Sequence, residues 1–158
     1  MFRRLLIAVL ALSAAGFALA AYSMAHKVGF TSGAFCDINA TFNCDVVNKG
    51  PFSEVAGIPV ALLGLVAYAF YALAAGLKLR QPGDKQVTAF LLYSSFFGLL
   101  FALYLTGIEA FVLRTFCIVC LTSQAVILAL FACVARLAWM EEHPVRGFFN
   151  RLFRKGSV

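Results

Sequence analysis

The sequence has few charged residues. Asp, Glu, Lys and Arg make up 13% of its 158 residues, whereas hydrophobic residues make up 63%. Soluble domains carry about 25% charged and roughly 45–50% apolar residues. This shortage of charge excludes an ordinary soluble domain and indicates that lipid is the solvent. The basic residues are not interleaved with aromatic ones as on a nucleic-acid surface, so the net charge of +6 favours contact with anionic lipid and no nucleic-acid partner.

Charge is absent from four long apolar runs, which comprise residues 5–25, 58–77, 87–108 and 117–135. A membrane span takes about 20 mainly apolar residues, and in lipid it must be helical because its backbone has no water to bond. We therefore predict an all-α membrane protein whose single domain, residues 1–158, is a bundle of four transmembrane helices. A transporter is a poorer hypothesis. Substrate paths through membranes usually contain pairs of ionisable residues, and the four predicted spans contain no charged pair.

The Lys and Arg residues predict how the chain is oriented. Ten of the 13 lie at the N-terminus, between the second and third spans or after the fourth span, and three lie on the other side. Because basic residues are retained in the cytoplasm, both termini are expected to be cytoplasmic. The first run could instead be a cleaved signal peptide, but residues 26–57 form an outer loop in either case. Within this loop, Phe52–Gly57 is expected to form a short helix.

Cysteine is also scarce, yet four of the five cysteines are expected on one side of the membrane. Cys36 and Cys44 lie in the outer loop, and Cys117 and Cys120 begin the fourth span. The partial positive charge of a helix N-terminus favours a thiolate at Cys117, and Cys120 lies one turn deeper, toward the bilayer interior. These residues therefore predict a redox relay. Structural disulfides that staple the loop remain an alternative. A zinc site has less support, because the cysteines lie at the lipid boundary with no nearby pattern of loop carboxylates or histidines.

The cysteine pattern and the sequence around it resemble those of the vitamin K epoxide reductase family, in particular its bacterial quinone-linked members. The resemblance rests on Cys36-Asp37 with Cys44 eight positions later, on Gly57-Ile58-Pro59-Val60-Ala61-Leu62-Leu63-Gly64, and on Cys117-Ile118-Val119-Cys120. It implies a four-helix bundle around a quinone, ubiquinone or menaquinone. It also implies that Cys120 reduces the quinone, that Cys117 exchanges with Cys44, and that Cys36 accepts electrons from a separate thioredoxin-like protein.

The resemblance further implies a location and an activity. The protein is expected in the bacterial inner membrane, with its active site on the periplasmic side, where it would support disulfide formation. Reduction of vitamin K epoxide itself is an alternative, and so is a membrane scaffold without enzymatic activity.

The sequence departs from the family pattern at two positions. Gly50 stands where the family often has a Ser, and its N–H could replace the hydroxyl as a quinone contact. Gln124 stands where vertebrate members have a Tyr; its amide could bind a quinone carbonyl or join two helices. Two further residues have open roles. Glu109 could relay protons or be a boundary residue paired with Arg114, and Cys133 is expected to be a buried thiol.

Overall fold

The computed structural model describes residues 1–31, 37, 39 and 41–154, with side chains as far as residue 141. Cys36 lies outside the described residues. The long helices are α1 (Phe2–Lys27), α3 (Val60–Arg80), α4 (Lys85–Ile108) and α5 (Ile118–Arg154). Within these described ranges, four helical segments are long and apolar enough to cross a membrane. This confirms the predicted all-α membrane fold, although α5 continues well beyond the predicted end of the fourth span at residue 135.

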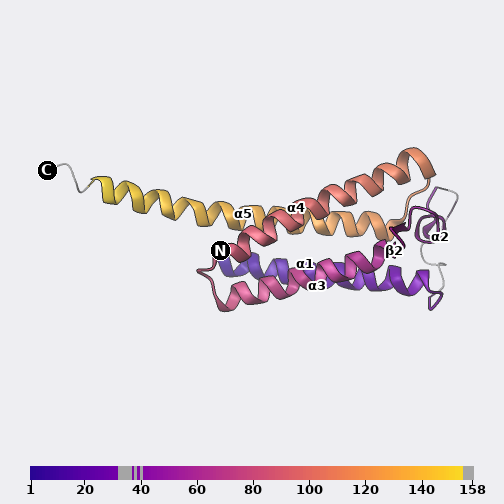
Figure 1. Ribbon diagram of the computed structural model, residues 1–158, viewed down its shortest axis with the longest axis horizontal. Helices are drawn as coiled ribbons and strands as arrows, with labels where there is room; N and C mark the ends of the chain where they lie inside the picture. Colours follow the sequence, from indigo (N-terminus) through magenta and orange to yellow (C-terminus); the bar gives the residue numbers. More distant parts are fainter. Residues whose placement is uncertain (32–36, 38, 40, 155–158) are drawn as a thin grey trace.

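The long helices lie alongside one another and define two ends of the molecule (Figure 1). The short elements α2 (Cys44–Asn48), β1 (Glu54–Val55) and β2 (Ile58–Pro59) gather at one end, which we call the loop end. The N-terminus and the turn between α3 and α4 lie at the opposite end, and α5 projects beyond that end.

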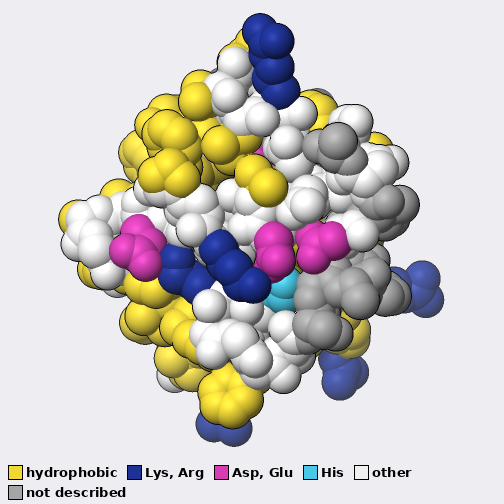
Figure 2. Space-filling model, turned by 90° about the vertical axis from the view of Figure 1, so that its right-hand side faces the viewer, with side chains coloured by type: hydrophobic (Ala, Val, Ile, Leu, Met, Phe, Trp, Pro, Cys, Tyr) yellow, Lys and Arg dark blue, Asp and Glu magenta, His cyan; other side chains and the backbone are white. Residues whose placement is uncertain are grey.

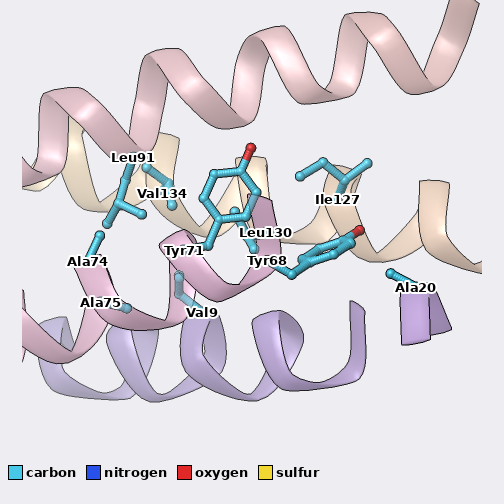
Figure 3. Packing of buried hydrophobic residues seen from close by; sticks show 10 residues of the cluster. All are labelled: Val9, Ala20, Tyr68, Tyr71, Ala74, Ala75, Leu91, Ile127, Leu130 and Val134. Carbon is cyan, nitrogen blue, oxygen red and sulfur yellow. The ribbon is translucent and has the colours of Figure 1, made fainter. Parts of the chain in front are cut away.

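The core between the helices combines aliphatic side chains with two tyrosines from α3. Tyr68 and Tyr71 point from α3 toward α4 and α5 (Figure 3), and the Tyr71 hydroxyl donates to the Ser94 carbonyl of α4 at 2.9 Å. Gly16 of α1 lies against the Tyr68 ring so closely that an added Cβ would overlap it. Because lipid provides no hydrophobic drive for helix association, such close approach at small residues stabilises the α1–α3 pair through packing.

A buried ion pair joins α3 and α5 near the end opposite the loops. The Lys78 side chain has no exposed surface, and its Nζ lies 2.6 Å from Glu141 Oε1. Nζ also donates to the Asp84 carbonyl and lies 5.9 Å from the centre of the Phe2 ring. Lys78, near the end of α3, therefore contacts the beginnings of α1 and α4 and the interior of α5.

The loop does carry a short helix, but the predicted location at Phe52–Gly57 is wrong. Glu54–Val55 and Ile58–Pro59 pair as antiparallel strands. The residues that join them, Ala56 and Gly57, have φ angles of 53° and 79°, as two-residue hairpin turns require. The short helix is α2, which begins at Cys44 because the Asn43 side chain accepts the Val46 N–H at 3.0 Å and caps it.

Candidate active site

A backbone contact joins the outer loop to the segment before α5. Phe42 and Phe116 form a parallel bridge. The Phe116 N–H donates to the Thr41 carbonyl at 2.8 Å, and the Asn43 N–H donates to the Phe116 carbonyl at 3.1 Å. Cys44 and Cys117 each follow one of these bonded segments, so the bridge brings the two cysteines together.

The resulting contact is between two buried sulfur atoms. The Sγ atoms of Cys44 and Cys117 lie 3.0 Å apart, and their residues are 1% and 0% exposed. Cys44 is disulfide-bonded, whereas Cys117 is a free thiol. A thiolate attacks a disulfide at one of its sulfur atoms, so this pair has the components and the proximity that exchange requires.

Cys120 is the third sulfur of the cluster. Its backbone N–H points at Cys117 Sγ from 3.3 Å, as the free N–H groups of a first helical turn can. A hydrogen bond from the Cys120 thiol lowers the pKa of Cys117 below its usual value; burial opposes this effect, and the Cys120 N–H supports it. These hydrogen bonds therefore favour ionisation of Cys117.

A cavity of about 340 Å³ begins where Cys120 lies and extends between the helices. Apolar side chains provide most of its wall, and its size falls within the range of small-molecule sites. Its polar lining residues are Ser23, Asn48, Ser53, Tyr68, Tyr71, Thr106, Glu109, Cys120, Ser123 and Gln124. The sulfur cluster thus ends at an apolar cavity with several hydrogen-bonding groups.

Comparison with known proteins gives this arrangement a context. A model of the vitamin K epoxide reductase family matches residues 7–135, which is most of the chain. The chain belongs to the vitamin K epoxide reductase family. None of the curated proteins compared with the chain matches it. Members of this family are membrane oxidoreductases that act on thiols and disulfides and use a quinone or vitamin K as redox partner.

The two positions that depart from the vitamin K epoxide reductase pattern differ in location. Gln124 lines the cavity, and its Oε1 accepts the Thr106 hydroxyl, so it joins α4 to α5 and faces the cavity at once. Gly50 does not line the cavity; an added Cβ there would overlap the Val46 carbonyl oxygen. The close turn after α2 accounts for the glycine, and its contact with a quinone stays a prediction that this placement does not favour.

Ser53 takes a cavity position that the sequence did not assign to it. Ser53 is 8% exposed and lines the cavity. Its Oγ accepts from Lys27 Nζ at 2.7 Å, and the same ammonium lies 3.0 Å from Glu54 Oε1. Lys27 at the end of α1 therefore fixes the loop over the cavity. No local sequence pattern indicates this contact, because it depends on how the loop folds back.

Charged side chains of both signs form a row across the loop end (Figure 2). His26 is buried, and its Nε2 lies 3.1 Å from Asp45 Oδ1. Lys49 Nζ lies 2.7 Å from the same oxygen, and a hydrogen bond from Lys49 lowers the pKa of the Asp45 carboxyl. Asp45 is the second residue of α2, so its contact with His26 attaches the helix that begins at Cys44 to α1. The pair with Lys49 lies within α2 and its C-cap.

Proposed function

We propose that this protein is a quinone-dependent thiol–disulfide oxidoreductase of a bacterial inner membrane. It reoxidises a dithiol on a thioredoxin-like periplasmic protein and passes the electrons to a membrane quinone. The observation that carries this proposal is the contact of three cysteines, in which buried Cys44 and Cys117 lie next to Cys120 at the cavity wall.

Electrons enter through the loop cysteines. The partner dithiol reduces a Cys36–Cys44 disulfide, so that the partner gains a disulfide and Cys36 and Cys44 become thiols. The Cys44 thiolate then attacks Cys117 Sγ of a Cys117–Cys120 disulfide, and Cys120 leaves as a thiolate that takes up a proton and becomes a thiol. Cys36 finally attacks Cys44, which restores the loop disulfide and releases Cys117. The contact between disulfide-bonded Cys44 and the free Cys117 thiol corresponds to the product of this exchange.

The cavity has the properties that a quinone site needs. Its wall is mainly apolar, as a quinone ring and an isoprenoid tail require, and its volume of about 340 Å³ is sufficient for a ring. Gln124 accepts the Thr106 hydroxyl through Oε1, which leaves its amide N–H groups to donate to a quinone carbonyl. A quinone bound there would supply a two-electron, two-proton oxidant for the Cys117–Cys120 dithiol.

The distribution of charge supports the periplasmic location of the loop end. The described loop-end residues include the basic Lys27 and Lys49, whose ammonium groups are paired with Glu54 and Asp45. The opposite end carries Arg3, Arg4, Lys78, Arg80 and Lys85. The end with the excess of basic residues is the one expected to stay in the cytoplasm.

Turnover in proteoliposomes tests this proposal. The purified protein is supplied with a reduced thioredoxin-like protein and either ubiquinone or menaquinone, and loss of the quinone absorbance is followed. We expect turnover in the wild type and in Cys133→Ala, and none in Cys44→Ala or Cys120→Ala. Vitamin K epoxide serves as a parallel substrate. Turnover with the epoxide but with neither quinone would identify the protein as an epoxide reductase. Turnover with none of the three would favour a membrane scaffold without enzymatic activity.

A further inference from the structure

Glu109 is a buried acid at the meeting point of the cysteines and the cavity. It is 3% exposed and lines the cavity wall together with Cys120. One carboxylate oxygen accepts the Cys117 N–H at 3.1 Å, and the Cys120 side chain interacts with the same carboxylate. Glu109 therefore contacts both members of the Cys-x-x-Cys pair. Arg114, the partner suggested by the sequence, is exposed, and no ion pair between described residues joins it to Glu109.

The local backbone explains how this contact arises. Glu109 begins the π-helix η2 (Glu109–Leu113), which continues α4, and Arg114 then adopts a left-handed conformation with φ 51°. The Thr115 N–H bonds back to the Glu109 carbonyl at 3.2 Å. The chain thus reverses within eight residues and presents the Cys117 N–H to the Glu109 carboxylate. Single π-helical turns of this kind occur frequently at functional sites.

We propose that Glu109 accepts the proton that the Cys120 thiol loses when the Cys117–Cys120 disulfide forms, and holds it on its carboxylate at the cavity wall. This inference rests on the proposed function, because quinone reduction is the reaction that would consume the proton. Since the carboxylate touches a reacting thiol, Glu109 is then a catalytic residue and more than a cap for the start of α5.

The protons and electrons balance. Oxidation of two thiols to one disulfide breaks two S–H bonds, forms one S–S bond and releases two electrons and two protons. Conversion of a quinone to a quinol takes up the same number of each. The Cys117 proton leaves to water when that thiolate forms, and an equivalent proton returns from water. The Cys120 proton moves to Glu109 and from there to the reduced quinone.

The other polar groups of the cavity are less suited to this role. Most are hydroxyl or amide groups, which do not accept a proton near neutral pH. The Tyr71 hydroxyl donates to the Ser94 carbonyl, and the Tyr68 hydroxyl bonds to Ser123. Among the described residues that line the cavity, Glu109 is the one carboxylate, and it interacts with the thiol whose proton must leave.

Infrared difference spectroscopy tests the proton transfer without quinone turnover. The reduced, quinone-free protein is oxidised electrochemically, and the carboxyl stretching region is compared before and after. We expect oxidation to produce the band of a protonated carboxylic acid. The band should be missing in Glu109→Gln and in Cys120→Ala, and it should remain in Glu54→Gln, which removes a carboxylate at the loop surface. A spectrum without any band that depends on Glu109 would overturn the proposal.

Single-turnover kinetics separate this inference from the proposed function. The first step, reduction of the loop disulfide by the partner dithiol, involves neither Cys117 nor Cys120, so its rate in Glu109→Gln should equal that of the wild type. Quinone reduction by Glu109→Gln should be slower by about 100-fold or more, the scale of general acid–base catalysis. Equal quinone reduction in Glu109→Gln and wild type would refute the role of Glu109 alone. A wild-type protein that reduces no quinone would refute the proposed function itself.

Discussion

The Sγ atoms of Cys44 and Cys117 lie 3.0 Å apart, although 73 positions separate the two residues in the sequence. The parallel bridge between Phe42 and Phe116 brings their segments together, and the Asn43 cap begins α2 at Cys44. The contact therefore depends on the backbone of both segments. Substitutions in these segments should slow disulfide exchange even when all the cysteines are kept.

The first prediction is that Cys44 and Cys117 can be trapped as a mixed disulfide. In a Cys36→Ala/Cys120→Ala variant neither resolving thiol remains, so mild oxidation should join Cys44 to Cys117 nearly completely. Mass spectrometry of the digested protein identifies the linked peptides. A Cys36→Ala/Cys117→Ala variant is the matched control. Predominant linkage to Cys133 in the first variant would contradict the geometry of the site.

The second prediction concerns the pH dependence of Cys117. The Cys120 thiol lowers the pKa of Cys117, so the thiolate should persist below the usual cysteine pKa of about 8.5 and disappear as the pH falls further. Replacing Cys120 with Ala removes the thiol donor but keeps the backbone N–H, so the midpoint should move to higher pH. The rate of reaction with a small thiosulfonate, located by mass spectrometry, reports this midpoint. An unchanged midpoint in Cys120→Ala would show that the Cys120 thiol does not lower the pKa of Cys117.

The sequence predicts the four spans and the grouping of Cys117 with Cys120 because both depend on local composition and spacing. It predicts the outer loop less well. The Phe52–Gly57 segment forms a hairpin, because Ala56 and Gly57 both adopt positive φ, and composition alone does not distinguish such a turn from a short helix. The contacts of Cys44 and Lys27 arise from how the loop folds onto α1 and α5, so no local pattern reveals them.

The third prediction concerns the ion pair between Lys78 and Glu141. Removing one partner leaves the other charge buried, which costs roughly 3–5 kcal/mol. We therefore expect Lys78→Met to lower the thermal unfolding midpoint in detergent strongly, and Lys85→Met, at an exposed position, to change it little. The double variant Lys78→Met/Glu141→Leu should recover much of the loss. If the double variant were less stable than Lys78→Met, the unpaired Glu141 charge would not be the cause of the lower unfolding midpoint in Lys78→Met.

The fourth prediction concerns the packing of α1 against α3. Because an added Cβ at Gly16 would overlap the Tyr68 ring, Gly16→Ala should reduce the free energy of unfolding by about 1–3 kcal/mol. Gly76→Ala is the matched control: nothing lies within 4 Å of its added Cβ, and the exchange in a helix should stabilise by roughly 0.5–1 kcal/mol. Equal effects of the two substitutions, measured by denaturant unfolding in detergent, would contradict the close contact.

The transfer of electrons from the Cys117–Cys120 dithiol to a quinone is the central claim. The most direct test is a single turnover in which the purified, dithiol-reduced protein is mixed with one equivalent of quinone and the quinone absorbance is followed. Wild type and Cys133→Ala should consume the quinone rapidly and form the Cys117–Cys120 disulfide, whereas Cys120→Ala should consume none. Persistence of the quinone beside reduced and accessible wild-type thiols would contradict the account.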